Sequence, residues 1–274
     1  MLIWVIGADG LLGKTVPGDI RSNKEQADIT NIASLRSFAV KNPGITHLVN
    51  ASAYSLVDLA ETNRNVAFQV NALGPENLGR IANEIGAKVI HISTDYVFPG
   101  NIFRPLSEED QTCPVNYYGE TKLEGEQRLL SIAPHSCVIR TSALFGKGGK
   151  NFIAKLLQMF QEKEEIFLAN DQVNSPTFAN DLCDAIFHLL NHSGIYHFSN
   201  QGEATKFDFG QEIYQFAKSK GIKLKTKSIH SVPSSLFPSA CKRPVYSVFD
   251  TGKMQKDFAI RDWRSALHSF LESV

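Results

Sequence analysis

The stretch that decides the fold is LIWVIGADGLLG, residues 2–13. Its first residues are almost continuously apolar, which favours a strand buried on both faces. Gly7, Gly10 and Gly13 follow this strand directly. Such a turn lets backbone pass close to a pyrophosphate, while the following helix presents free N–H groups and its positive end to the phosphates. The sequence therefore predicts a dinucleotide site at the first strand–helix junction.

The next hundred residues or so alternate apolar runs with segments of helical period. Strands are predicted at 46–53, 88–94 and 137–145, and helices at 67–86 and 116–133, where apolar residues recur at spacings of three and four. Alternating strands and helices favour a parallel sheet with helices on both faces. We therefore predict an α/β protein built on a Rossmann-type, doubly wound parallel sheet.

After about residue 150 this rhythm loosens. Helices are predicted at 151–164, 178–192 and 207–221, strands at 166–169 and 194–200, and an exposed Pro/Ser-rich loop at 230–244. We predict a dinucleotide-binding domain at 1–150, to which 178–200 returns, and a smaller α/β substrate-binding domain made of 151–177 and 201–274.

Composition excludes several classes of protein. The 274 residues include 28 basic and 28 acidic side chains, so no net basic field favours nucleic acid or an anionic membrane. No apolar run approaches the roughly 20 residues of a membrane span, and no basic leader with a cleavage site is visible. The four cysteines are scattered, with no His/Cys cluster at zinc spacing, so no metal site is predicted. A cytoplasmic protein is expected.

The segment after Gly13 is short. Too few residues separate it from Asp28 for a full helix, a loop and a strand, so a stunted first helix and a short second strand are expected. An acidic residue near the end of that strand would favour NAD, and basic residues would favour NADP. Asp19, Arg21 and Lys24 all lie near this point, which leaves the choice between NADH and NADPH open.

A second group of residues indicates acid–base chemistry. Tyr118 and Lys122 are four residues apart and share a face of the predicted helix. A nearby ammonium favours the phenolate of a tyrosine, which suits general acid–base catalysis. Thr94, at the end of the preceding strand, could hydrogen-bond a substrate carbonyl. These roles fit reduction of a carbonyl by hydride transfer, in which a nicotinamide cofactor supplies the hydride and the protein the proton.

The spacing alone is a weak signal, because Tyr214 and Lys218 have the same one. That second pair lies on a predicted helix whose phenylalanines indicate ordinary amphipathic packing. Tyr118 is distinguished by its position after a dinucleotide-type half and after a strand that ends in Ser93 and Thr94. We therefore interpret Tyr118 and Lys122 as the functional pair.

Longer motifs add a resemblance that covers most of the chain. They include VNASAYSLVDLAE (49–61), HISTDYVFPG (91–100), NYYGETKLEGE (116–126), VIRTSALFG (138–146) and KRPVYS (242–247). With the glycine loop, these resemble the extended short-chain dehydrogenase/reductase family, and within it the enzymes that reduce nucleotide-linked sugars. The resemblance implies NADPH- or NADH-dependent reduction of the 4-keto group of dTDP-4-dehydro-L-rhamnose, in nucleotide-sugar and polysaccharide biosynthesis.

The resemblance also assigns roles to residues. Thr94, Tyr118 and Lys122 would be catalytic. The cofactor would be bound by Gly7, Asp9, Gly10, Leu11, Leu12, Gly13, Asp28, Ile29, Ala51, Ser52, Ala53, Asn71, Tyr118 and Lys122. The nucleotide sugar would be bound by Val57, Asp58, Asp95, Tyr96, Phe98, Asn151, Val173 and Arg243, where the arginine suits the phosphates.

Some positions depart from the family's pattern. Ala143 and Lys206 stand where relatives commonly carry tryptophans, and Asn174 where glycine is usual. Less aromatic surface would weaken stacking or enlarge the pocket, so a different nucleotide-linked 4-keto-deoxysugar is the closest alternative. A non-catalytic, NADP-binding regulatory subunit is the alternative from another class, although the catalytic pair is present. A monomer or a homodimer is expected.

Overall fold

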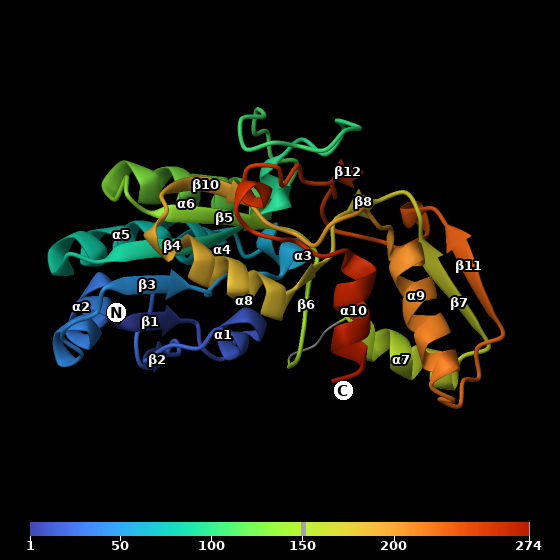
Figure 1. Ribbon diagram of the computed structural model, residues 1–274. Helices are drawn as coiled ribbons and strands as arrows, with labels where there is room; N and C mark the ends of the chain where they lie inside the picture. Colours follow the sequence, from blue (N-terminus) through green and yellow to red (C-terminus); the bar gives the residue numbers. More distant parts are fainter. Residues whose placement is uncertain (149–151, 274) are drawn as a thin grey trace.

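A parallel sheet of six strands lies at the centre of the described residues, 1–148 and 152–273, of this computed structural model (Figure 1). Its order is β10-β5-β4-β3-β1-β2, and every neighbouring pair is parallel. The strands are β1 (Ile3–Ile6), β2 (Ile20–Ser22), β3 (His47–Asn50), β4 (Lys88–Thr94), β5 (Cys137–Thr141) and β10 (Gly194–His197). The predicted Rossmann-type α/β fold is confirmed.

Helices cover both faces of this sheet, because its strands are apolar on both sides. Ile3 and Val5 of β1 pack with one set of helices, and Trp4 and Ile6 with the other, as the two-residue period of a strand requires. The first set is α1 (Leu11–Thr15) and α8 (Ala179–His188), and the second is α2 (Ile32–Lys41), α5 (Gly74–Ile85) and α6 (Tyr117–Ile132). Figure 1 shows these two layers at the left.

Helix α1 has five residues and strand β2 has three, so the expectation of a stunted first helix and a short second strand is confirmed. The chain leaves β1 for β2 on one side and later returns to β3 on the other side of β1. Such a point, where the strand order reverses, opens a crevice at the carboxyl ends of the strands. The glycine loop lies at this position.

The predicted helix at 67–86 is part of a longer helical segment. It begins as α4 (Arg64–Phe68), passes through a π-helical turn, η1 (Gln69–Leu73), and continues as α5. Helix α3 (Val57–Ala60) precedes it. Helix α6 packs closely against the π-helical turn, because a Cβ at Gly125 would overlap the carbonyl oxygen of Asn71. That contact fixes α6, with its tyrosine and lysine, beside the sheet.

A second group of elements has its own core, which includes Phe145, Leu156, Phe209 and Trp263. Two parallel strands, β7 (Glu165–Ala169) and β11 (Ser228–Val232), pair beside α7 (Phe152–Glu162), α9 (Lys206–Ser219) and α10 (Trp263–Leu271). The predicted loop at 230–244 is therefore wrong at its beginning. The polar residues of β11 concealed a strand that β7 stabilises by pairing.

Short strand pairs lie between the two groups. They are β6 (Leu144–Phe145) with β9 (Thr177–Phe178), and β8 (Val173–Asn174) with β12 (Tyr246–Ser247). Four short 3₁₀ turns complete the described elements, namely η2 (Asp95–Val97), η3 (Leu189–Asn191), η4 (Ser234–Leu236) and η5 (Met254–Lys256). The division of the chain into two domains stays a prediction. Within the described residues, no helix combines the length and apolar character needed to cross a membrane.

Candidate active site and cofactor-binding site

Tyr118 and Lys122 lie on one face of α6, and α6 packs on strand β4. The helix begins after Asn116, whose side-chain oxygen accepts a hydrogen bond from the Gly119 N–H at 2.9 Å. Strand β4 ends at Thr94, and the side chains of Thr94 and Tyr118 are hydrogen-bonded to each other. The three residues predicted to be catalytic thus meet at the carboxyl end of β4.

Lys122 is buried, with only 1% of its surface exposed. Its Nζ donates a hydrogen bond to the Ile92 carbonyl oxygen at 2.6 Å and lies 3.5 Å from His91 Nε2. Burial lowers the pKa of Lys122 to about 8, while the charge of Glu126, one helical turn further on, acts in the opposite direction. The charged form of Lys122 is therefore destabilised by its burial in the folded protein.

Burial shifts the pKa of Tyr118 in the opposite direction to that of Lys122. Burial raises its pKa above the ordinary value of 10, and the hydrogen bond with Thr94 acts against this rise. The sequence suggested that Lys122 would favour the phenolate, but its Nζ is directed to the Ile92 carbonyl. The expected lowering of the Tyr118 pKa is therefore wrong for the protein without ligands. The phenol stays protonated at neutral pH, which is the form that donates a proton.

Asp95 joins the catalytic strand to two other segments. Its carboxylate accepts hydrogen bonds from Thr94 Oγ1 at 3.1 Å, Ser142 Oγ at 3.0 Å and Ser247 Oγ at 2.6 Å. Burial raises the pKa of Asp95, and these hydroxyls act against that rise. With three donors already bound, Asp95 acts on the site chiefly through the positions of Thr94 and its other partners.

A buried ion pair beneath the site was not anticipated from the sequence. Arg140 of β5 and Glu126 of α6 form a salt bridge at 2.7 Å, and their side chains are almost completely buried. The Ser93 hydroxyl also donates to Glu126. Two signals were available, because Glu126 lies four residues after Lys122 and Arg140 is the one charged residue in the apolar run CVIRT. The pair links the catalytic helix to the sheet.

The glycine loop fits a dinucleotide by its own geometry. Gly7 has φ of +79°, and a Cβ there would lie 2.7 Å from the Ser52 backbone nitrogen, so only glycine suits this turn. Beside it is a cavity of about 370 Å³. Five residues predicted to bind the cofactor line this cavity, namely Gly7, Asp28, Ile29, Ser52 and Ala53, as do Lys24 and Tyr54.

The other predicted cofactor residues surround this cavity without lining it. Asp9 and Gly10 are exposed in the glycine loop, Leu11 begins α1, Leu12 and Gly13 are buried, and Ala51 donates its backbone N–H to the Ile6 carbonyl. Asn71 is 1% exposed, and its side chain bonds the Tyr54 backbone and Thr121 Oγ1. These contacts let Asn71 position the loop that contains Tyr54.

The structure shows which of the charged residues near β2 lies beside the cofactor cavity, a choice that the sequence left open. Asp19 accepts a hydrogen bond from the Ile3 N–H at 2.9 Å. The Arg21 guanidinium donates to the carbonyl oxygens of Gly13 at 2.5 Å and Val16 at 2.6 Å. Lys24 is the one of the three that lines the cavity, and it is therefore the residue placed to meet a charged group there.

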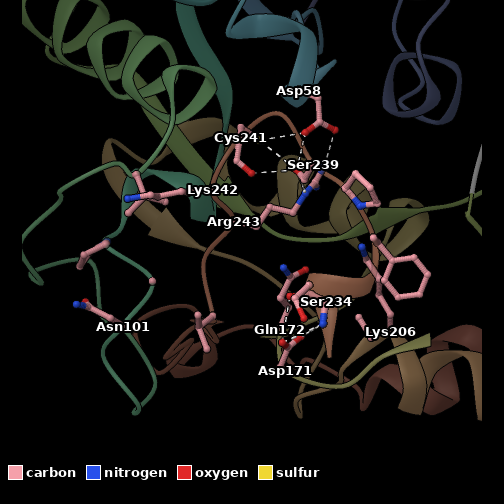
Figure 2. A pocket seen from close by; sticks show the side chains of 18 residues that line it. Asp58, Asn101, Asp171, Gln172, Lys206, Ser234, Ser239, Cys241, Lys242 and Arg243 are labelled. Carbon is pink, nitrogen blue, oxygen red and sulfur yellow. Dashed lines mark hydrogen bonds and ion pairs between the residues drawn. The ribbon is translucent and has the colours of Figure 1, made fainter. Parts of the chain in front are cut away.

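A larger cavity, of about 780 Å³, lies between the two groups of elements (Figure 2). On one side Arg243 donates to Asp58 at 2.7 Å and to the Tyr96 hydroxyl at 3.2 Å. Ser239 and Cys241 also donate to Asp58. Lys206 and Lys242 line the cavity as well. Three basic side chains around one cavity suit a polyanionic ligand such as a pyrophosphate.

The residues predicted to bind substrate are distributed unevenly around this cavity. Asp58 and Arg243 line it, and Tyr96 reaches Arg243 through its hydroxyl. Val57 begins α3 and Val173 begins β8. Phe98 is completely buried against His197 and Phe249, so its predicted contact with the substrate is not available in this structure. Asn151 lies outside the described residues.

A smaller and more apolar cavity, of about 210 Å³, lies beside the segment that follows β5. It is lined by Ala143, Leu144, Phe145, Phe152, Asn174, Pro176, Thr205, Lys206 and Phe209. Ala143 has an unusual φ of +43° and follows Ser142, which bonds Asp95. Lys206 lines both this cavity and the larger one. The two cavities are therefore neighbours.

Comparisons with known proteins agree with this geometry. The dTDP-4-dehydrorhamnose reductase of Escherichia coli strain K12 is 35% identical over 272 residues, which are 96% of this chain and 91% of that protein. A probable dTDP-4,6-dihydroxy-2-methyloxan-3-one 4-ketoreductase of Streptomyces antibioticus is 32% identical over 287 residues, which are 99% of this chain and 95% of that protein.

The fold is matched just as closely. The crystal structure of a Bacillus anthracis dTDP-4-dehydrorhamnose reductase in complex with NADP has a TM-score of 0.93 and 32% identity, with 99% of both chains covered. Residues 1–274 match the family described as RmlD substrate binding domain. With its glycine loop, its Thr94, Tyr118 and Lys122 cluster and relatives of this kind, the chain belongs to the RmlD substrate binding domain family.

Proposed function

We propose that this protein reduces the 4-keto group of dTDP-4-dehydro-L-rhamnose to give dTDP-L-rhamnose, with NAD(P)H as the hydride source. The observation that carries the proposal is the meeting of Thr94, Tyr118 and Lys122 at the end of β4. The same molecule has a glycine loop with a cavity beside it and a larger cavity lined by basic side chains. The names of the relatives support the same reaction.

The residues of the glycine loop fit a dinucleotide. Gly7 and Ser52 leave room only for backbone, and the adjoining cavity receives Asp28, Ile29 and Lys24. These residues would hold the adenosine half of the cofactor, and the N–H groups that begin α1 would face its phosphates. When bound, the dihydronicotinamide would supply a hydride to C4 of the sugar.

The catalytic residues would provide the proton and the polar environment. Tyr118, protonated because of its burial, would donate its phenolic proton to the oxygen of the C4 carbonyl. The Thr94 hydroxyl would orient that oxygen, and its own position is fixed by Asp95 and Tyr96 N. Lys122, charged below a pH of about 8, would stabilise the tyrosinate left after transfer.

NADPH is the cofactor that the cavity at Gly7 favours. Lys24 lines it, and a basic group at this point suits the 2′-phosphate. Asp28 lines the same cavity but already accepts two hydrogen bonds from Thr30, at 2.8 and 2.9 Å. Because the reaction consumes NAD(P)H and a nucleotide sugar, the cytoplasm stays the expected location.

A different nucleotide-linked 4-keto sugar is the second candidate substrate. The apolar cavity between Ala143 and Phe209, with the Lys206 side chain at its border, offers space for a substituent beside C4. The Streptomyces antibioticus relative, named for a different sugar, supports this alternative. Comparing kcat/KM for dTDP-4-keto sugars that differ at C2 and C3 would decide between the two.

The test is oxidation of NADPH and NADH in the presence of dTDP-4-dehydro-L-rhamnose, followed by absorbance. Wild type would turn over, and Tyr118→Phe would lose about 10²- to 10⁴-fold in rate, the usual contribution of a general acid. Tyr214→Phe, in the other pair with this spacing, is the matched control and would keep full activity. Equal rates for wild type and Tyr118→Phe would reject the proposed mechanism.

A further inference from the structure

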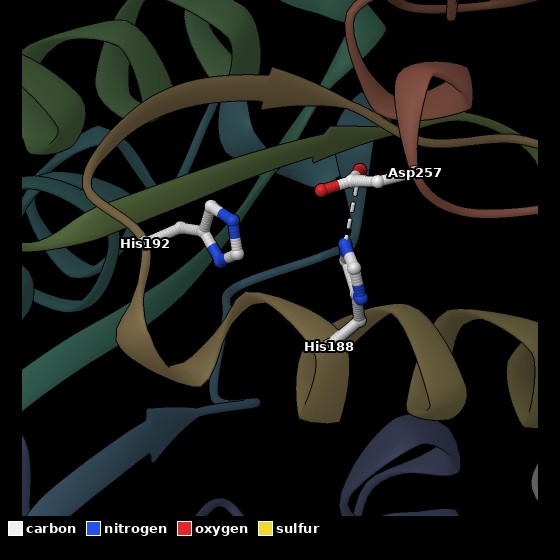
Figure 3. Close-up of side chains that lie close together, drawn as sticks. All are labelled: His188, His192 and Asp257. Atoms are coloured by element: carbon white, nitrogen blue, oxygen red, sulfur yellow. Dashed lines mark hydrogen bonds and ion pairs between the residues drawn. The ribbon is translucent and has the colours of Figure 1, made fainter.

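His188, His192 and Asp257 come together near the start of the edge strand β10 (Figure 3). His188 is the last residue of α8, and His192 follows the η3 turn and precedes β10. Asp257 follows η5, near the end of the chain. The sequence shows only the first two as neighbours, so no metal-binding spacing was visible in it.

The distances suit a transition-metal ion. His188 Nε2 and Asp257 Oδ1 are 3.2 Å apart, and one ligand atom from each residue lies within 4.8 Å of the other two. Around a tetrahedral zinc ion, with bonds of about 2.1 Å, such atoms are about 3.4 Å apart. The His188–Asp257 pair already has that separation. A side-chain rotation of His192, whose ring stacks on His188 with centroids 5.3 Å apart, would complete the set.

A second observation concerns His192 alone. Its Nδ1 is buried and has no hydrogen-bond partner among the described residues. Buried polar atoms of this kind are normally bonded, and leaving one unpaired is costly. An ion or an ordered water between the rings would satisfy it. The His192 ring is otherwise held by an edge-on contact with Tyr196 at 5.8 Å.

The charges around the cluster favour binding of a cation with moderate affinity. Asp257 supplies a negative charge, and the carbonyl end of α8 at His188 favours positive charge. Lys253 lies 4.1 Å over the Tyr196 ring and would oppose it. Two imidazoles and one carboxylate are ligands that suit Zn²⁺, Co²⁺ or Ni²⁺ better than Mg²⁺ or Ca²⁺. Asp257 is largely exposed, so solvent can reach a fourth position.

We propose that His188, His192 and Asp257 form a binding site for one divalent transition-metal ion of the zinc class, separate from the catalytic residues. The bound ion would join the end of α8 to the chain that follows η5. Its function would be structural, because the cluster lies beside the amino-terminal end of β10, whereas Thr94 and the glycine loop lie at the carboxyl ends of β4 and β1. An ion that binds only the folded state stabilises it, and the stabilisation grows with the logarithm of the free ion concentration above the dissociation constant.

The test is calorimetric titration of the chelator-treated full chain with Zn²⁺, together with the visible spectrum of its Co²⁺ complex. Wild type would bind one Zn²⁺, its midpoint of thermal unfolding would rise with Zn²⁺, and Co²⁺ would show the intense bands of tetrahedral coordination. His192→Gln and Asp257→Asn would each weaken binding about tenfold or more and remove the thermal shift.

His135→Gln is the matched control, because His135 is exposed and outside the cluster, and it would leave binding unchanged. Circular dichroism of each variant without metal would establish that it is folded. Absence of one-to-one binding in wild type, or unchanged Zn²⁺ affinity in folded His192→Gln, would overturn the proposal. Reductase activity is not needed for any of these readings, so the outcome is independent of the proposed function.

Discussion

Substitution of Lys122 by methionine tests whether the buried ammonium is kept for function at the expense of stability. Methionine keeps an unbranched apolar side chain as far as Cε and lacks the ammonium group, with its charge and its hydrogen bond. In the folded protein the pKa of Lys122 falls from 10.5 to about 8. At about 1.4 kcal/mol per pH unit, this shift destabilises the protonated folded state by about 3 kcal/mol at neutral pH.

Removing the ammonium relieves this destabilisation, but the variant loses a hydrogen bond as well. The Ile92 carbonyl loses the hydrogen bond that Nζ donates at 2.6 Å, which costs about 1 kcal/mol. Lys122→Met is therefore expected to raise the free energy of unfolding by about 2 kcal/mol at pH 7. For a protein near this size, that corresponds to a rise of about 4 to 8 °C in the unfolding midpoint. Reduction of the keto sugar would be lost at the same time.

The pH dependence gives the sharper test. Between pH 8 and 10.5 the folded lysine has released its proton while the unfolded one keeps it, so wild-type stability rises with pH. The advantage of the variant would therefore shrink to nearly nothing by about pH 9.5. Denaturant unfolding at both pH values measures it, with the exposed Lys218→Met as control. A variant less stable than wild type at pH 7 would refute this reasoning.

Three other perturbations have definite expected outcomes. Lys24→Glu, in the cavity beside the glycine loop, would raise KM for NADPH by about tenfold or more and leave KM for NADH nearly unchanged, since only NADPH carries the 2′-phosphate. Arg243→Lys would raise KM for the nucleotide sugar with little change in kcat. A lysine has no planar guanidinium that could bind a phosphate through two N–H groups while also donating to Asp58. Glu126→Gln leaves Arg140 buried without its charged partner and would lower the free energy of unfolding by about 3 to 5 kcal/mol, which denaturant titration measures.

The sequence predicted the sheet well because its strands are buried on both faces. The run LIWVI at residues 2–6 is continuously apolar, and this local signal predicts a buried strand without knowledge of its pairing partner. Strand β11 was missed because SIHSV is half polar and is stabilised by pairing with β7, which lies 63 residues earlier along the chain. The local sequence of β11 does not indicate which distant strand pairs with it.

The features of the candidate site that depend on local spacing could be predicted, and those that depend on contacts between distant segments could not. Tyr118, Lys122 and the glycine loop were recognisable because their spacing along one helix or one turn is the signal. The bonds of Asp95 with Ser142 and Ser247, and those of Glu126 with Arg140, join segments far apart in the chain. The direction of the Tyr118 pKa also depends on burial, which the spacing of two residues does not reveal.

The position of strand β10 has a consequence for how the protein can be cut. Residues 194–197 form the outer strand next to β5, and α8 covers one face of the same sheet. A fragment that ended near residue 148 would expose the hydrogen-bonding edge of β5 together with apolar residues such as Ile139 and Ile90. Unpaired apolar edges of this kind recruit other chains. Limited proteolysis between the two groups of elements should therefore yield aggregating material instead of a soluble nucleotide-binding half.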